Sequence, residues 1–325
     1  MTKLDTTYDV IVIGAGVAGT HAAHAAGKEG ARTLLLTSCW DTAACLAWGP
    51  RTHQKTHGRV KVRLGMNREI VRKATLYRGA VEGKETILLD EYKYQGFWRE
   101  KLERQGGLTI FQDTCHEVIK KDKMWQVGTG WGVEFHGKTL IMTLGTFLGA
   151  SVLTGRDRAE GGRPGEKGSS KLAASLLKIG AKPGRNRRTA DPIISAKGIQ
   201  WRAVQNIDEK TGFCSVSSRG GRKVFLEPTG PGRQQFYLRT GNDGKKDDVV
   251  WRQLPGLEKV EVIRSEYSVV HKKIESWQLQ ETYESSFAEG LFFAGQVIGA
   301  KDYVASASQG IVAGKSANQK VSRET

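Results

Sequence analysis

Three glycines near the start of the chain have a spacing that can place peptide backbone against a diphosphate. Gly14, Gly16 and Gly19 follow a short apolar run in the stretch DVIVIGAGVAG. The first glycine permits a sharp exit from a strand, the second lets backbone approach a pyrophosphate, and the third lets a helix pack against the sheet. A helix that begins here would also offer its N-terminal amides and its dipole to the phosphates. The pattern therefore predicts a dinucleotide site.

The cysteines and histidines do not have the spacing of a metal site. The chain contains four cysteines, Cys39, Cys45, Cys115 and Cys214. They include no C-x-x-C pair and are too widely spaced for a disulfide scaffold, which favours a reducing compartment. His53 and His57 lie four residues apart without a sulfur or acidic ligand nearby, so we interpret them as solvent-facing. His21 and His24 follow the glycines and are candidates for a place near ribose or phosphates.

The elements expected around the glycines form a β-α-β unit. Residues 8–13 have the pattern of a buried parallel strand, residues 17–28 that of an Ala-rich helix, and residues 31–36 that of a second strand. This context makes the glycine motif much more specific than it is alone. The second strand ends at Thr37, where a dinucleotide site usually has an acid for the ribose hydroxyls, and Asp41 is the nearest substitute. The motif alone leaves NAD, NADP and FAD open.

Further segments place parallel-sheet elements at both ends of the chain. A third buried strand is expected at 139–144, ending at Gly145, and a last one at 291–294, followed by a helix from near Ser306. A helix over 90–105 carries aromatic residues that we assign to the core, and Ser169 is a candidate N-cap for a helix over 169–179. Residues 185–256 are polar, turn-rich and expected to be irregular. We therefore expect a nucleotide-binding domain from 1–150 and 285–325, and an inserted region over 151–284 that faces the substrate.

The charge of the chain favours a polyanionic partner. The formal net charge is +16. Residues 51–78 contain nine Lys and Arg with one acid, and residues 155–188 contain ten with three acids. Concentrated positive charge neutralises phosphates and releases their counterions. No apolar run approaches the ~18 residues of a membrane span. The first strand begins too early for a signal peptide, so a cytoplasmic location is expected.

Several blocks of sequence together resemble the MnmG (GidA) family of FAD-dependent tRNA-uridine modification enzymes. The family opens with YDVIVVGGGHAG and continues with A-x-T-L-L-L-T, and this chain has YDVIVIGAGVAG and ARTLLLT. Further matching blocks are LGTFLGA, GGRPGE, FLEPTG and EGLFFAGQVIGAKDYVASASQGIVAG. The blocks follow the family's order almost from end to end. Thr37 belongs to the family pattern, which accounts for the missing acid.

The resemblance implies an α/β, Rossmann-like FAD-binding fold of the glutathione-reductase type with a contracted inserted region. It implies FAD rather than NAD on the glycine loop. Cys115 matches a backbone contact near adenine, Gln296 matches the residue that faces the flavin, and the helix start near Gln309 and Gly310 would direct its positive end at the isoalloxazine. Together with the strand ends, the candidate cofactor contacts are Gly14, Ala15, Gly16, Val17, Ala18, Gly19, Thr37, Cys115, Gly145, Ser169, Gln296, Gln309 and Gly310.

The resemblance also implies a reaction and partners. The family joins a one-carbon unit from a tetrahydrofolate to C5 of the wobble uridine of tRNA, with NADH reducing the flavin and an MnmE-type GTPase alongside; a homodimer is a further candidate assembly. Cys214, upstream of FLEP, and Cys45 are the candidate catalytic thiols. The alternative for Cys214 is a half-buried thiol without a role. Arg59, Lys61 and Arg63 are the candidate contacts to RNA phosphate.

The chain departs from the family at several positions. Trp48 takes the place of an early family cysteine, with Cys45 three residues before it, and Val304 and Ala305 replace two glutamates. The family's T-G-T-P-P-R loop survives only as RTADPII. The chain is about half the family's usual length and is expected to lack the C-terminal helical domain that helps to hold tRNA and the partner.

Three functions stay open at this point. The first is an FAD-dependent RNA-uridine modifying enzyme of the MnmG type, or a folate-using uridine methyltransferase related to it. The second is a minimal FAD-dependent oxidoreductase that has lost the RNA chemistry. The third is a non-enzymatic nucleic-acid-binding module, against which the intact glycine loop argues.

Overall fold

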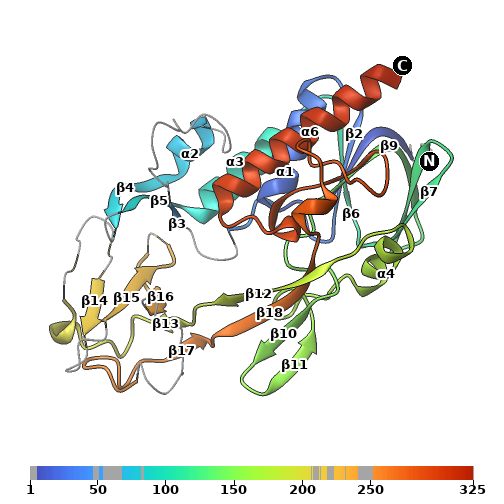
Figure 1. The fold of residues 1–325 in the computed structure, drawn as a ribbon. Helices are drawn as coiled ribbons and strands as arrows, with labels where there is room; N and C mark the ends of the chain where they lie inside the picture. Colours follow the sequence, from blue (N-terminus) through green and yellow to red (C-terminus); the bar gives the residue numbers. More distant parts are fainter. Residues whose placement is uncertain are drawn as a thin grey trace.

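The computed structural model describes residues 6–46, 51–53, 68–81, 84–205, 207, 212, 214–217, 223–230, 232–240 and 252–324. A seven-stranded, mostly parallel sheet lies in the same part of the molecule as α1, α3, α4 and α6, and the strands β13 to β17 lie at the opposite end (Figure 1). The strands of this sheet are, in spatial order, β6 (Leu108–Gln112), β2 (Thr33–Thr37), β1 (Thr7–Ile13), β9 (Glu134–Met142), β8 (Met124–Thr129) and β7 (Cys115–Lys121), with β19 (Leu291–Phe293) also paired to β9. β1, β2, β6, β9 and β19 pair in parallel, whereas β7, β8 and β9 form an antiparallel meander.

Alternation along the strands divides the apolar side chains between the two faces of this sheet. Val10 and Val12 of β1 belong to one buried cluster, and Ile11 and Ile13 belong to the other. The first cluster includes side chains of α1 (Val17–Lys28), α2 (Arg68–Ala74), α3 (Glu91–Glu103) and α6 (Tyr303–Glu324), and the second includes those of α4 (Ser170–Lys178). A parallel sheet that is covered on both faces has strands with continuous apolar sequence, as residues 10–13 have.

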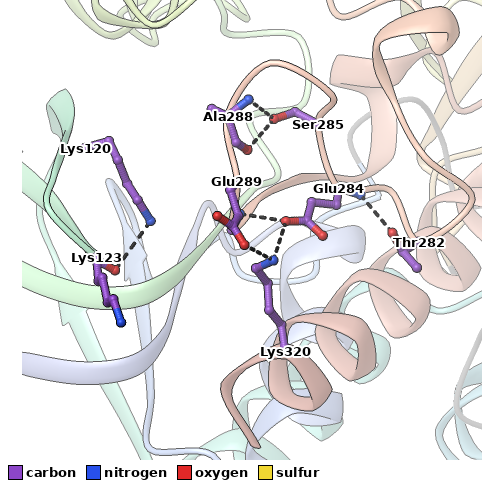
Figure 2. A network of polar contacts seen from close by, with 9 residues as sticks. Lys120, Lys123, Thr282, Glu284, Ser285, Ala288, Glu289 and Lys320 are labelled. Carbon is purple, nitrogen blue, oxygen red and sulfur yellow. Dashed lines mark hydrogen bonds and ion pairs between the residues drawn. The ribbon is translucent and has the colours of Figure 1, made fainter. Parts of the chain in front are cut away.

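The helix α6 lies alongside α1 (Figure 1), and glycines in α6 allow the two helices to approach closely. A Cβ atom on Gly310 would lie 2.2 Å from the carbonyl oxygen of Ala18, and one on Gly314 would lie 2.4 Å from that of Ala22. Farther along α6, Lys320 is held between Glu289, at 2.7 Å, and Glu284, at 3.2 Å (Figure 2). These contacts fasten α6 to α1 and to the segment that leads into β19.

Three antiparallel sheets complete the described strands. The first contains β3 (Arg51–His53), β5 (Lys84–Leu89) and β4 (Thr75–Val81); the second contains β11 (Asp157–Glu160), β10 (Ser151–Thr154), β18 (Tyr267–Lys273) and β12 (Gly184–Ala190); the third contains β14 (Cys214–Ser217), β15 (Lys223–Pro228), β16 (Gln235–Thr240), β13 (Ile193–Ser195) and β17 (Val262–Arg264). The 3-10 helices are η1 (Trp201–Ala203), η2 (Ser276–Gln278) and η3 (Gly295–Ile298).

The local elements around the glycine motif are confirmed. The predicted helix over residues 17–28 is α1, and the four predicted strands of the parallel sheet are β1, β2, β9 and β19 with ends shifted by a few residues. The helix α3 buries Tyr94, Trp98 and Leu102, as expected for core aromatics, and the Asp90 carboxylate accepts a hydrogen bond from the Lys93 amide to cap it.

Two expectations about the elements are wrong. Residues 185–256 are not irregular where the structure describes them: β13, β14, β15 and β16 pair antiparallel around a separate core that includes Val216, Leu226 and Phe236. These strands are short, and β13 pairs with β16 and β17, which lie far from it in the sequence, so the local pattern does not reveal the sheet. The last helix begins at Tyr303 rather than near Ser306 or Gln309, because the Asp302 carboxylate accepts a hydrogen bond from the Ala305 amide, 2.7 Å away.

The boundary of the inserted region stays a prediction. The four-stranded sheet, which contains β10, β11, β12 and β18, falls within residues 151–284. The five-stranded sheet, which contains β13 to β17, falls within the same limits. The helix α4 lies within the same limits, yet it packs Leu172 and Leu176 into the second cluster of the parallel sheet. The Ser175 hydroxyl also accepts a hydrogen bond from the Val118 amide of β7. Residues 170–178 therefore share the core of the nucleotide-binding fold.

Candidate nucleotide-binding site

A cavity of about 630 Å³ lies at the carboxyl ends of the parallel strands. It is lined by the residues that follow β1, β2, β6, β9 and β19, which are brought together because all five strands run in the same direction. In open α/β sheets, ligands bind in the crevice at this edge, where strand order reverses. The size is within the range of cofactor pockets.

The glycine motif forms the middle of the cavity. Gly14 has φ +99°, and a Cβ atom on it would lie 2.6 Å from the Thr143 carbonyl oxygen, so only glycine fits the exit from β1. A Cβ atom on Gly19 would lie 1.7 Å from the Gly14 carbonyl oxygen. Thr143, at the end of β9, donates from its hydroxyl to the carbonyls of Ile13 and Gly14, both at 2.8 Å. The loop is thus fixed by the strand beside it.

The second glycine of the motif, Gly16, leaves the space that a diphosphate needs to approach the backbone. Gly16 lines the cavity, and a Cβ atom on it would contact nothing within 4 Å. The missing side chain therefore leaves open space where a phosphate can approach the backbone. Gly16 is also the N-cap of α1 and brings no capping side chain, so the first-turn amides at Val17 and Ala18, both lining the cavity, are available to an anion. This arrangement fits the diphosphate of FAD.

One end of the cavity lies beyond β2 and β6, the side of a dinucleotide fold that takes the adenosine. Thr37 lines it and donates from its hydroxyl to the Cys39 carbonyl, 3.3 Å away. The buried Asp113 follows β6, and its amide donates to the Thr37 carbonyl. Its two carboxylate oxygens accept the amides of Thr114, at 2.6 Å, and Trp131, at 3.0 Å. Cys115 lines this end too, and burial raises the pKa of its thiol.

The other end lies beyond β9 and β19. Gly145, with φ +57°, Ser169 and Gln296 line it. Ser169 is the N-cap of α4, and its amide donates to the Phe147 carbonyl. Tyr303 and Ser306 from the first turn of α6 also line this end.

Three predicted cofactor residues do not line the cavity. Gly19 and Gly310 serve close packing, against Gly14 and Ala18 respectively. Gln309 accepts a hydrogen bond from the Gly295 amide at 2.9 Å and so supports the left-handed turn after β19, where Gly295 has φ +87°. The predicted helix start at Gln309 is wrong because α6 begins at Tyr303, almost two turns earlier.

Cys45 lies at the cavity in a neutral form. Its thiol donates to a Glu91 carboxylate oxygen at 3.3 Å, and it accepts a hydrogen bond from the Arg163 guanidinium, also at 3.3 Å. Burial, and then the Glu91 charge, raise the pKa of Cys45 to about 12. The same Glu91 oxygen accepts the Leu46 amide, and the Ala44 amide donates to the Ala15 carbonyl. The thiol is therefore held next to the glycine loop, but it is not a thiolate in this conformation.

Cys214 is not brought to the cavity. It is 3% exposed in β14 and belongs to the core of the five-stranded sheet. Burial raises the pKa of its thiol to about 11. The side of β14 on which Cys214 lies faces that core, which the sequence neighbours of the cysteine do not reveal. A catalytic part for Cys214 stays a prediction.

The remaining predicted residues lie elsewhere. Trp48, Arg59, Lys61 and Arg63 are outside the described residues, as is His57. His21 is buried in α1 against the Trp98 ring, with centroids 4.2 Å apart, and His24 contacts Gln105, so neither is at the phosphates. The exposed Asp41 pairs with Arg99 at 3.6 Å and does not replace the missing ribose acid.

Sequence reasoning missed several residues that line the cavity. Arg163 and Glu166, paired at 2.7 Å, come from the GGRPGE block, which by itself indicates only a glycine-rich loop. His116 and Trp131 also line the cavity. The sequence gives a signal for Asp113, because an acid directly after a parallel strand lies at the ligand edge of the sheet.

The described part of the chain offers neither a metal centre nor a membrane-spanning helix. Among the residues that the structure describes, no group of three or more His, Cys, Asp or Glu side chains has the geometry to hold a metal ion. No helix in the described ranges is sufficiently long and apolar to cross a membrane.

Comparisons with solved structures support the fold. The crystal form II and form I structures of GidA from Aquifex aeolicus match with TM-scores of 0.88 and 0.84, at 22% and 23% identity. The matches cover 99% and 98% of this chain and 65% and 66% of those chains. The GidA-related protein from Thermus thermophilus matches at a TM-score of 0.58 and 16% identity, over 98% of this chain and 99% of that one. The predicted Rossmann-like FAD-binding fold is confirmed.

Comparisons of sequence give the family. The tRNA uridine 5-carboxymethylaminomethyl modification enzyme MnmG of Bacteroides thetaiotaomicron is 28% identical to this chain. The match covers 97% of this chain and 62% of that enzyme, so the chain spans about three fifths of the relative's length, rather than the expected half. The family model described as "Glucose inhibited division protein A" matches residues 9–219 and 210–325. Because these ranges cover nearly the whole chain, which also has the fold of GidA, the chain belongs to the glucose inhibited division protein A (GidA) family.

Proposed function

We infer that this chain binds FAD across the carboxyl edge of its parallel sheet and acts in flavin-dependent modification of uridine in tRNA. The observation that carries the proposal is the continuous cavity from the β2–β6 end to the β9–β19 end, with Gly16 opening its middle. When bound, the flavin would supply reversible hydride and electron transfer. The activity for which the MnmG relative is named, modification of uridine in tRNA, supports the substrate.

Different residues of this chain would bind the three parts of the cofactor. The backbone amides at the start of α1 would hold the diphosphate, and the residues after β2 and β6 the adenosine. Gly145, Ser169 and Gln296 would border the flavin, and the N-terminus of α6 would direct its positive end toward it. The loop that carries Cys45 covers the glycine motif from the side of α3. NADH as the reductant and a tetrahydrofolate as the carbon source complete the proposal, with tRNA and an MnmE-type GTPase as partners.

A second candidate function follows from the state of the two thiols. Cys45 is neutral and hydrogen-bonded to Glu91, and Cys214 is in a separate core. Neither is poised as a nucleophile toward a pyrimidine bound at the cavity. A minimal FAD-dependent oxidoreductase without RNA chemistry is therefore the alternative, and it requires the same cofactor site.

The test of FAD binding uses the second glycine of the motif. FAD at 100 times its dissociation constant should raise the free energy of unfolding of the wild-type chain by about 2.7 kcal/mol. Gly16→Val should abolish that gain and any flavin absorbance, yet leave the chain folded, because its Cβ meets open space. Denaturant unfolding with and without FAD measures both. A wild-type chain that gains nothing from FAD, or a Gly16→Val chain that gains as much, would contradict the proposal.

A nucleoside assay distinguishes tRNA-uridine modification from the minimal oxidoreductase. Mass spectrometry of tRNA nucleosides from a strain that lacks the gene should show loss of a C5-substituted wobble uridine, restored by the wild-type gene and not by the Gly16→Val gene. An unchanged nucleoside profile beside normal FAD binding would favour the oxidoreductase.

A further inference from the structure

Trp131 is an exposed indole at the edge of the cavity. Its side chain is 87% exposed, and it is among the residues that line the cavity. Full exposure of a large aromatic side chain forfeits the free energy that its burial would give. Single exposed apolar residues are common on protein surfaces, but this one borders a cavity of the size that holds cofactors.

The indole is carried on a backbone turn that has little freedom. Residues 130–133 join β8 to β9, and the amides of Gly132 and Val133 donate to the Thr129 carbonyl and hydroxyl, respectively. The Thr129 amide donates back to the Val133 carbonyl, 3.0 Å away. The Trp131 amide itself donates to the buried Asp113 carboxylate. A ligand that stacks on the indole would therefore lose little free energy in ordering this backbone.

The turn also lies at the adenosine end rather than the flavin end. The Gly130 amide donates to the Thr114 carbonyl at 2.8 Å, and a Cβ atom on Gly130 would lie 3.1 Å from an Asp113 carboxylate oxygen. Asp113 follows β6, and its amide is bonded to Thr37 at the end of β2. Although the turn joins β8 to β9, these contacts place it beside the end of β6, whereas the flavin end lies beyond β9 and β19.

We propose that Trp131 is the stacking platform for the adenine of the bound dinucleotide and a determinant of the preference for FAD over FMN, which has no adenine. The inference rests on the proposed binding of FAD. Stacking of a base on an aromatic side chain depends on the flat π faces and not on base edges. The indole therefore adds affinity, while the backbone at Cys115 is left to contact the adenine edge.

The experiment compares ligands with and without adenine. Trp131→Ala should weaken binding of FAD and of ADP about tenfold, equivalent to about 1.4 kcal/mol, which lies within the range for base–aromatic stacking. Trp131→Phe should retain most of the affinity, and binding of FMN should not change. Trp277→Ala is the matched control, because Trp277 is 67% exposed on η2 and does not line the cavity. Isothermal titration calorimetry measures the constants, and quenching of indole fluorescence by FAD should be smaller in Trp131→Phe.

The outcomes distinguish failure of the role inferred for Trp131 from failure of the proposed FAD binding. Unchanged FAD affinity in Trp131→Ala, beside tight binding to the wild type, would overturn the inference alone. An equal loss for FMN would also overturn it, because the effect would then not depend on adenine. Unchanged FAD affinity with weakened RNA binding would assign the indole to RNA and overturn it as well. A wild-type chain that binds neither FAD nor ADP would overturn both.

Discussion

His21 shows how a residue next to the glycine motif can serve packing instead of the ligand. It is one helical turn beyond Val17, and its Nδ1 lies 2.7 Å from the Val17 carbonyl oxygen, which requires a proton on that nitrogen. The ring is buried against Trp98. Burial lowers the pKa of His21 from its ordinary value of 6.5 to about 3. The folded chain therefore keeps this imidazole neutral over the range in which the unfolded chain protonates it.

The stability of the fold should decrease as the pH falls because of this residue. Below pH 6.5 the unfolded state binds a proton that the folded state does not bind until about pH 3, so the contribution is lost between these values. At pH 5 the cost is about 2 kcal/mol. Urea unfolding of the wild type and of His21→Leu at pH 7.5 and pH 5 measures it. The wild type should lose about 2 kcal/mol more than the variant, and equal losses would contradict the prediction.

At the scale of elements, the packing of α6 on α1 depends on glycine. Gly310→Ala places a methyl group 2.2 Å from the Ala18 carbonyl oxygen, a backbone atom that cannot move alone. We expect this overpacking to cost about 1–3 kcal/mol, more than the gain in helix propensity of up to about 1 kcal/mol. Denaturant unfolding should therefore show a less stable chain.

The matched control is a glycine in another helix. Gly96 lies in α3, is exposed, and a Cβ atom on it would meet nothing within 4 Å. Gly96→Ala should raise the free energy of unfolding by about 0.5–1 kcal/mol, since only propensity changes. If both variants were stabilised, the close approach of α6 to α1 would be incorrect.

The sequence predicts the elements whose signals are local. The run before Gly14, the alanines of α1 and the start of β2 follow one another closely along the chain, so the β-α-β unit is evident from the sequence alone. Asp302 is also a local signal, an N-cap before Tyr303, and it could have given the correct start of α6. The pairing of β19 with β9 depends on contacts between residues far apart in the chain, such as Leu291 and Leu140, so the position of β19 in the sheet follows only from the family resemblance.

The candidate site is predictable where it consists of backbone and unpredictable where it consists of side chains from other loops. Gly14 to Ala18, Thr37, Gly145 and Gln296 all line the cavity. Trp131 and Arg163 reach it from turns whose place depends on the whole fold, so no spacing could identify them. For Cys45 and Cys214, only the tertiary packing shows that one lies at the cavity and the other in a core.

At the scale of the whole molecule, part of the basic stretch over residues 155–188 lies on the exposed surface of the four-stranded sheet. Arg185 and Arg187 of β12 are both exposed and lie on the same face of the strand, and Lys272 of β18 is directly opposite Arg185. Charges two residues apart on a strand project to the same side. Such a face suits neighbouring phosphates of a polyanion, and contacts of this kind position a nucleic acid without reading its sequence.

The salt dependence of tRNA binding should report these contacts. Reversing both charges, with Arg185→Glu and Arg187→Glu together, should weaken binding and reduce the slope of log K against log salt by about 1 to 2. Lys121→Glu with Lys123→Glu is the matched control, because both residues are exposed at the β7–β8 turn on a different sheet. Filter binding over a salt series measures the slope. Equal effects of the two pairs would show that net charge alone is responsible.

The pairing of β9 with β19, a strand much later in the chain, has a consequence for folding during synthesis of the protein. Its carboxyl-terminal part pairs with β19, and α6 then covers the alanine surface of α1. While a ribosome is still adding residues 291–324, the nascent polypeptide exposes that alanine surface, and the flavin end of the future cofactor cavity lacks a wall. Flavin capture must then follow the synthesis of β19 and α6, and chaperones have a defined apolar surface to protect until these elements are in place.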